Sequence, residues 1–279
     1  MTSTTTCCKG KPVTEEDVQL KASVRKAYAE VAVKNSAGKA VGIQSSCCGA
    51  PKEVDIEYCK KFLGYTDDDM KTMVDGANMG LGCGNPTAIA ELKEGQVVLD
   101  LGSGGGFDCF LAAKKVGKTG TVIGVDMTPE MLHKARLNAR KGGYTNVSFR
   151  LGEIEHLPVA DNTVDAIISN CVINLATDKA QVIREAARVL RRGGRLAISD
   201  IVATSPLPEE IKQDLELYNG CMAGATPVGE LKEALENAGF TNISIQVNEE
   251  SRQFIEKWSH IDRGVQNYVA SAIIEAAKM

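Results

Sequence analysis

The stretch VVLDLGSGGGFD, residues 97–108, decides the fold. Its first half is an apolar, β-branched run, and its second half is a glycine-rich turn that leads into the apolar segment DCFLAAKKVG. Asp100, Gly102, Gly104 and Gly106 have D-x-G-x-G-x-G spacing. Glycines let the backbone of such a turn approach a ligand closely where a helix begins. The stretch therefore predicts a buried strand, a ligand-binding turn and a helix.

The same alternation continues towards the carboxyl terminus. The short apolar runs TVIGVD, VSFR, VDAIIS and RLAISD are separated by segments of helix length. Such alternation predicts parallel βα units. The intervening segments end in glycine and positive charge, as the C-termini of helices prefer. We therefore expect an α/β fold, a Rossmann-like doubly wound sheet with helices on both faces.

The segments on either side of this core differ in pattern. Thr14 followed by Asp17 predicts the start of a helix of about 20 residues, and Thr66 is expected to cap a short helix. After Asp200 we expect a helix near Glu209–Tyr218, the turn NGCMAGA, the helix VGELKEALENAG, the strand TNISIQV and a final helix ending AIIEAAKM.

These patterns divide the chain into three parts. We expect an N-terminal helical and cysteine-bearing loop extension over residues 1–75, a ligand-binding core over 76–205 and a smaller α+β region over 206–279. The third part is expected to cover the site as a lid. Its helix and strand are equally compatible with an extension of the edge of the sheet.

A nucleoside site is indicated at the ends of the first three strands. Asp126 ends the second strand, where a carboxylate can accept hydrogen bonds from both ribose hydroxyls. Asp100 favours S-adenosylmethionine over a dinucleotide, because a carboxylate beside a pyrophosphate would be repulsive. The segment GEIEHLP after the third strand puts Glu153, Ile154 and Glu155 where an adenine ring would lie.

Composition narrows the function classes. The chain has 279 residues, 43% of them hydrophobic and 24% charged, with a net charge of −4. These values exclude collagen, a coiled coil and wholesale disorder, and the negative charge disfavours nucleic acid and anionic lipid as partners. No apolar run approaches the ~20 residues needed to cross a bilayer, and the start MTSTTTCCKG does not read as a signal peptide. We expect a cytoplasmic protein without nucleic-acid or membrane partners.

Nine cysteines are too many to treat as incidental. Adjacent pairs such as Cys47-Cys48 suit neither a disulfide scaffold nor a zinc site. Cys83 lies in the turn GLGCGNP, Cys171 follows the fourth strand, and Cys221 lies in NGCMAGA. We expect these three and one of the upstream pair to meet in one cavity, where thiolates would bind a soft ion. Cys109, within an expected core helix, is interpreted as a packing residue.

Six motifs together resemble the arsenite methyltransferase family, within the class I S-adenosylmethionine-dependent methyltransferases. They are GLGCGNP, LDLGSGGGFDCF, VDMTPEM, GEIEHLP, SNCVINL and NGCMAGA. The resemblance implies methyl transfer from S-adenosylmethionine to trivalent arsenic, with Cys171 and Cys221 as arsenic ligands and Cys83 as third ligand and redox partner. It also implies an upstream cysteine that pairs with Cys83. That position is doubled here, and we prefer Cys48 to Cys47 for the role.

The resemblance also implies cofactor contacts. Glu153 is added from the expected strand order, and Asp100, Gly104 and Gly106 from the glycine turn. The contacts that carry over from the family are Gly102, Ser103, Asp126, Met127, Met131, Ile154, Glu155 and Asn170.

The chemistry of arsenic agrees with this interpretation. Three thiolates around trivalent arsenic leave its lone pair free to attack a methyl group, so no base is required. Each methylation formally oxidises arsenic, and a thiol pair can return two electrons by closing a disulfide. Cys48 and Cys83 are the expected pair, with thioredoxin or glutathione as the reductant.

Two other functions remain open at this stage. One is a small-molecule C- or O-methyltransferase, although 5% aromatic residues and three histidines offer little for an apolar pocket with a base. The other is a thiol-rich protein that binds soft ions without turnover, which would not need a nucleoside site. Arsenite or its thiol conjugates are the expected substrates, and the sequence does not predict the oligomeric state.

Overall fold

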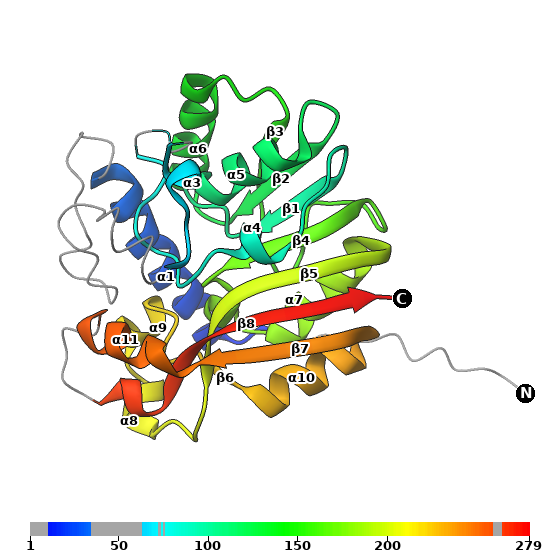
Figure 1. The fold of residues 1–279 in the computed structure, drawn as a ribbon. Coiled ribbons are helices and arrows are strands. Elements are labelled where there is room, and N and C mark those ends of the chain that lie inside the picture. Colours follow the sequence, from blue (N-terminus) through cyan, green and yellow to red (C-terminus); the bar gives the residue numbers. More distant parts are fainter. Residues whose placement is uncertain (1–10, 35–62, 72–73, 75, 259–263) are drawn as a thin grey trace, which may run out of the picture.

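The computed structural model describes residues 11–34, 63–71, 74, 76–258 and 264–279 (Figure 1). Within these residues, an eight-stranded sheet has the order β3-β2-β1-β4-β5-β8-β7, with β6 paired to β5 off this path. Strands β1 to β5 pair in parallel, whereas β8 is antiparallel to both of its neighbours. The strands are β1 (Val97–Leu101), β2 (Thr121–Asp126), β3 (Val147–Leu151), β4 (Val164–Asn170), β5 (Leu190–Ala203), β6 (Thr226–Pro227), β7 (Phe240–Asn248) and β8 (Val269–Lys278).

Helices cover both faces of this sheet. The helices are α1 (Glu15–Lys34), α3 (Asp67–Lys71), α4 (Pro86–Ile89), α5 (Phe107–Val116), α6 (Pro129–Gly142), α7 (Lys179–Val189), α8 (Glu209–Lys212), α9 (Leu215–Asn219), α10 (Val228–Asn237) and α11 (Arg252–Trp258). Short 3-10 turns are η2 (Ile173–Leu175), η3 (Glu249–Ser251) and η4 (Val265–Asn267). Every helix among the described residues is too short or too polar to span a bilayer.

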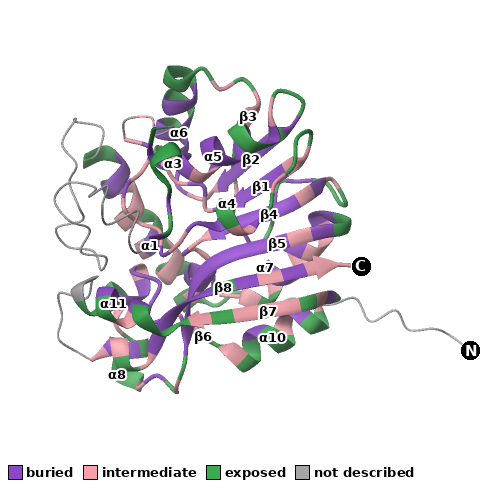
Figure 2. Cartoon of the chain, viewed as in Figure 1, coloured by how far each residue is buried: buried purple, intermediate pink, exposed green. Residues whose placement is uncertain are grey.

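Alternate residues of the central strands face opposite layers of the core. Leu99 and Leu101 pack with apolar residues of α7 and α10. Val98, which precedes Leu99 in the strand, packs on the other face with residues of α5 and α6. Figure 2 shows β5 buried along most of its length, while the edge strand β7 is largely intermediate or exposed. The predicted doubly wound α/β fold is therefore confirmed.

The predicted helix starts at Thr14 and Thr66 are also confirmed. The Thr14 hydroxyl accepts a hydrogen bond from the Asp17 amide at 3.1 Å, and the Asp17 carboxylate accepts one from the Thr14 amide at 2.9 Å. Thr66 and Asp69 repeat this reciprocal arrangement at the start of α3. Such a capping box satisfies amides that have no partner within the helix.

Two elements in the C-terminal part of the chain differ from the sequence prediction. The final helix was a wrong prediction, because residues 269–278 form strand β8, inserted antiparallel between β5 and β7. Residues of the run AIIEAAKM prefer a helix, but pairing with β5 along one edge and with β7 along the other stabilises a strand here. The helix expected near Glu209–Tyr218 is divided into α8 and α9, because Asp214 caps a new helix with hydrogen bonds from the Glu216 and Leu217 amides.

Helix α7 is shorter than the sequence predicts. Helix α7 ends at Val189, and the glycines and arginines expected at its end lie in β5 instead, where the pairing with β4 shifts register.

Strands β7 and β8 extend the edge of the main sheet, and helix α10 packs against it. The sequence had left this edge extension open as an alternative to a lid. Cys221 shares a buried apolar cluster with Cys83 and Cys171, and residues of α8, α11 and η4 belong to the same cluster.

Candidate active site

The glycine-rich turn between β1 and α5 forms the floor of a pocket at the carboxyl ends of the parallel strands. Gly102, Gly104 and Gly106 have φ angles of 69°, 49° and 93°, which disfavour any residue with a side chain. A Cβ on Gly102 would lie 2.5 Å from the Val172 side chain, so the close packing of this turn also requires glycine.

Asp126 is oriented by the turn that it faces. Its carboxylate accepts hydrogen bonds from the Gly104 amide at 2.9 Å and from the Thr128 amide at 2.8 Å. Burial raises the pKa of Asp126, and these two amide bonds oppose that shift. A fixed carboxylate at the end of the second strand suits the hydroxyls of a ribose.

One buried hydroxyl in the pocket is free of partners within the described part of the chain. The Ser103 hydroxyl is buried, lines the pocket and has no hydrogen-bond partner among the described residues. Buried hydroxyls normally find a partner, so this atom is available to a bound polar ligand. The residues present thus fit the nucleoside and amino-acid parts of S-adenosylmethionine.

Acidic side chains give the pocket a preference for a cation. Burial raises the pKa of Asp100 well above its usual value, and repulsion from Asp108 raises it further. Burial raises the pKa of Asp108 to about 6, against hydrogen bonds from Asn170 and Tyr65 that lower it. A sulfonium or ammonium group placed here would relieve this repulsion and favour the ionised carboxylates.

Most of the predicted cofactor residues line this pocket, and two do not. Gly106 is the N-cap of α5 and packs closely against Phe110 and Phe149. Glu153 is engaged outside the pocket by Lys21 and Arg25 of α1. The predicted residues that line the pocket are Asp100, Gly102, Ser103, Gly104, Asp126, Met127, Met131, Ile154, Glu155 and Asn170.

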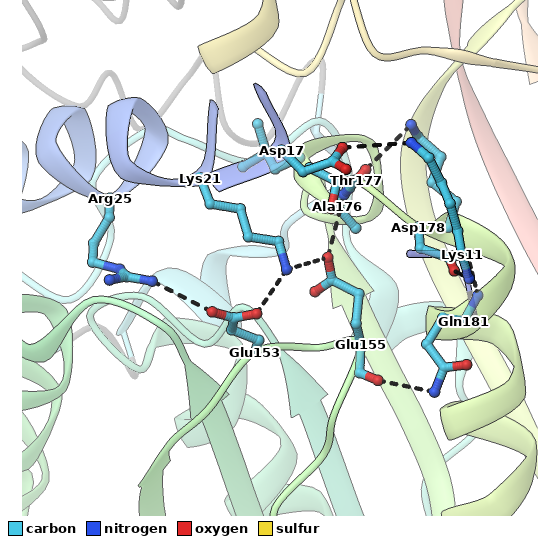
Figure 3. Close-up of polar contacts among 12 residues, drawn as sticks. Lys11, Asp17, Lys21, Arg25, Glu153, Glu155, Ala176, Thr177, Asp178 and Gln181 are labelled. Carbon is cyan, nitrogen blue, oxygen red and sulfur yellow. Dashed lines mark hydrogen bonds and ion pairs between the residues drawn. The ribbon is translucent and has the colours of Figure 1, made fainter. Parts of the chain in front are cut away.

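Helix α1 contributes to the pocket wall, and Figure 3 shows its Lys21 and Arg25 side chains reaching towards Glu153 and Glu155. The Lys21 ammonium contacts Glu153 at 2.7 Å and Glu155 at 2.9 Å, with 15% of the lysine side chain exposed. Burial lowers the pKa of Lys21, but the bonds to the two glutamates outweigh it and leave the pKa above its usual value. The Tyr28 hydroxyl donates a hydrogen bond to the Asn219 carbonyl at 3.2 Å, which links α1 to the turn that holds Cys221.

Three of the four predicted acceptor cysteines lie together beside the pocket. The structure bonds Cys83 to Cys171 as a disulfide, with the Cα atoms 6.1 Å apart. The Cys221 thiol is buried, and it donates a hydrogen bond to the Cys171 carbonyl at 2.7 Å. Cys171 also lines the cofactor pocket. Cys48 and Cys47 lie outside the described residues, so the expected pairing of Cys48 with Cys83 stays a prediction.

In this oxidised form, the described residues hold no cluster of three or more histidine, cysteine or acidic side chains arranged for a metal. Reduction of the Cys83–Cys171 bond would release two thiols next to Cys221. Cys109 behaves as the packing residue expected from its helix, because its thiol is buried against Asp100 at 3.1 Å and burial raises its pKa well above the usual value.

Sequence reasoning missed the residues that close the pocket from distant segments. Lys21, Val24 and Tyr28 come from α1, and Tyr65 comes from the residues before α3. Their positions depend on where α1 and the residues before α3 lie against the sheet, and no local sequence signal carries that information. Asp108 lay within the quoted stretch and carried a signal, a carboxylate directly after the glycine turn.

Comparison with known proteins agrees with this geometry. A profile of the methyltransferase domain family matches residues 92–239. The arsenite methyltransferase of Halobacterium salinarum is 50% identical over 260 residues, covering 91% of this chain and 66% of that protein. The mouse arsenite methyltransferase is 35% identical over 207 residues, covering 71% of this chain and 53% of the mouse protein.

A solved structure is similar in both sequence and fold. The crystal structure of an arsenic(III) S-adenosylmethionine methyltransferase from Chlamydomonas reinhardtii has a TM-score of 0.60 and 33% identity, covering 77% of this chain and 71% of that chain. The present chain spans between 44% and 66% of the length of the curated arsenite methyltransferases compared with it.

Proposed function

The chain belongs to the arsenite methyltransferase family, and from that premise we propose that it transfers methyl groups from S-adenosylmethionine to trivalent arsenic held by cysteine thiolates. One observation carries the proposal beyond family membership. Cys83, Cys171 and Cys221 come from three separate segments and meet at the edge of the cofactor pocket, with Cys171 in the pocket wall.

In this proposal, the cysteine thiolates coordinate arsenic and hold it next to the methyl donor. Soft arsenic prefers sulfur ligands, and three thiolates leave its lone pair directed away from them. The acidic pocket orients the cationic end of S-adenosylmethionine, which supplies the methyl group. The arsenic lone pair forms the new bond to carbon, and the electrons of the broken carbon–sulfur bond remain on the departing thioether. Proximity and orientation account for most of the expected rate.

A reductant is needed at two points. The Cys83–Cys171 bond must accept two electrons and two protons before all three thiols can bind arsenic. After methyl transfer, arsenic is formally pentavalent, and two thiols return it to the trivalent state by losing two electrons and two protons as they form a disulfide. We propose Cys48 and Cys83 as that pair, with thioredoxin or glutathione reopening the bond.

Arsenic speciation tests the reaction directly. Reduced protein incubated with arsenite, S-adenosylmethionine and a thiol reductant should yield methylated arsenic, resolved by chromatography with mass detection. Bound but unmethylated arsenite would identify a protein that sequesters the ion. If arsenite neither binds nor reacts, a carbon or oxygen acceptor becomes the better hypothesis.

We expect Cys48→Ser to restrict the reaction to a slow or single methylation, because the variant lacks the thiol that returns electrons to arsenic. The measurement is the yield of each methylated species per enzyme over time, with Cys47→Ser as the matched control at the neighbouring position. Normal multiple turnover by Cys48→Ser would assign the upstream role to Cys47 or Cys59 instead.

We expect Lys21→Met to weaken binding of S-adenosylmethionine by roughly tenfold, about 1.4 kcal/mol. The methionine removes the cation that joins α1 to Glu153 and Glu155, so the adenine side of the pocket loses its cover and the buried Glu155 loses its ion pair. Calorimetric titration measures the dissociation constant, and stopped-flow fluorescence measures the release rate of S-adenosylhomocysteine.

Lys34→Met is the matched control, because Lys34 lies on the same helix and pairs with Glu30 at the surface. Equal affinities and release rates for wild type and Lys21→Met would show that α1 does not retain the cofactor.

A further inference from the structure

The turn after β4 reaches all three segments that carry the acceptor thiols. We infer that residues 170–174, the sequence NCVIN, set the relative placement of these thiols, with Asn174 and Asp200 as positioning residues for Cys221. This inference rests on the proposed function, because it concerns how the same arsenic site is held.

Both cysteine turns have backbone conformations that need external support. Cys171 has a φ angle of 54° and Cys221 one of 64°, in the left-handed region that residues with side chains rarely adopt. Such conformations persist where neighbouring groups impose them, and they concentrate at functional sites. The hydrogen bonds around the two turns therefore identify the groups that hold them.

Asn174 ties the Cys221 turn to the sheet. The two N–H groups of its side-chain amide are shared among three acceptors, the Cys221 carbonyl at 3.1 Å, the Ile201 carbonyl at 2.6 Å and the Asp200 carboxylate at 3.0 Å. The Asn174 side chain is buried, with only 2% of the residue exposed. Loss of these bonds would leave buried carbonyl groups without their donor, which costs more than the bonds are worth in water.

Asp200 holds the other side of the same network. One carboxylate oxygen accepts a hydrogen bond from the Ile173 amide at 3.0 Å, two residues after Cys171. The other accepts from Asn174 and from the Ile201 amide at 2.8 Å. Asp200 thereby fixes the chain after Cys171 and orients the amide that reaches Cys221.

Asn170 performs the corresponding task for the third thiol. Its side-chain oxygen accepts a hydrogen bond from the Cys83 amide at 2.9 Å, and its nitrogen donates to the Gly84 carbonyl at 2.8 Å. A Cβ on Gly82 would lie 2.5 Å from this amide, so the Cys83 turn packs directly on Asn170. The two asparagines thus flank Cys171 in sequence and reach the loops of the other two thiols.

Asn174 and Asp200 are absent from the residues that line the cofactor pocket, whereas Asn170 lines it. Removal of the Asn174 amide should therefore change arsenic binding without a matching change in cofactor binding. A residue that only stabilised the fold would affect both.

The test uses the full chain, reduced and then freed of reductant, with arsenite as the probe. In Asn174→Ala we expect the dissociation constant for arsenite to rise about tenfold or more, while that for S-adenosylmethionine stays within about twofold. X-ray absorption should detect fewer than the three arsenic–sulfur bonds of the wild type.

Asn146→Ala is the matched control. The Asn146 amide also donates to two carbonyl groups, those of Ala113 and Gly117, but it lies before β3 and outside the pocket. Its arsenite affinity should equal that of the wild type. If Asn174→Ala does not fold, Gly224→Ala provides the second variant, because its methyl group would collide with the Asn174 carbonyl and displace the Cys221 turn.

Selective loss of arsenite affinity supports the inference. Wild-type affinity with three arsenic–sulfur bonds in the folded variant would overturn it and leave the proposed function intact, as would equal losses of arsenite and cofactor affinity. Failure of the reduced wild type to bind arsenite would remove the proposed function, and the inference with it.

Discussion

Replacement of Cys171 or Cys221 by serine should reduce the affinity of the reduced protein for arsenite by at least about 100-fold, or 2.7 kcal/mol. Serine preserves the shape of each turn but replaces a soft sulfur ligand with a hard hydroxyl oxygen. Cofactor binding should persist, because the pocket floor is formed by the glycine turn and Asp126. Titration with arsenite and, separately, with S-adenosylmethionine measures the two affinities.

Cys109→Ser is the matched control for these variants, measured for arsenite binding without cofactor. Cys109 is a buried cysteine away from the Cys83–Cys171 disulfide, and its thiol faces Asp100. Its replacement should leave arsenite affinity unchanged. Unaltered arsenite affinity in both Cys171→Ser and Cys221→Ser would contradict the ligand assignment.

Replacement of Asp126 by alanine should reduce S-adenosylmethionine affinity by about 100-fold or more. The variant lacks the carboxylate that would accept the ribose hydroxyls, and it also lacks the acceptor that holds the Gly104 amide in place. Arsenite binding to the reduced thiols should be retained. Calorimetry gives the affinity for the cofactor, and thermal unfolding shows whether the fold persists.

Asp161→Ala is the matched control for Asp126→Ala, because it also removes a carboxylate but at a site away from the pocket. Asp161 forms an exposed ion pair with Arg188 and lies outside the pocket. The control should bind S-adenosylmethionine like the wild type. If Asp126→Ala retained affinity within about threefold of the wild type, the nucleoside would have to bind elsewhere.

Local patterns predicted the elements that depend on local physics. The apolar runs identified β1, β2 and β4 because these parallel strands are buried on both faces, and Thr14 and Thr66 identified helix starts because capping involves residues three positions apart. Most of the predicted cofactor residues line one pocket for a related reason, since the glycine turn and the ends of adjacent strands meet at one edge of a parallel sheet.

The remaining features depend on contacts between distant segments. The run AIIEAAKM has the composition of a helix, and only its insertion between β5 and β7 makes it a strand. Lys21 appears as an ordinary surface lysine in the sequence until α1 is placed against Glu153 and Glu155. Asn174 likewise carries no local sign of its bond to Cys221.

Strand β8 has a consequence for biosynthesis. Strand β8 follows β7 in the chain but lies between β5 and β7 in the sheet. Both strands therefore lack β8 as a pairing partner while the ribosome is still making residues 269–278. Until then the nascent chain exposes the open edge of β5, and unpaired strand edges promote aggregation. Completion of the sheet therefore depends on a long-range pairing of β8 with β5, and slow synthesis of the chain would increase its demand for chaperones.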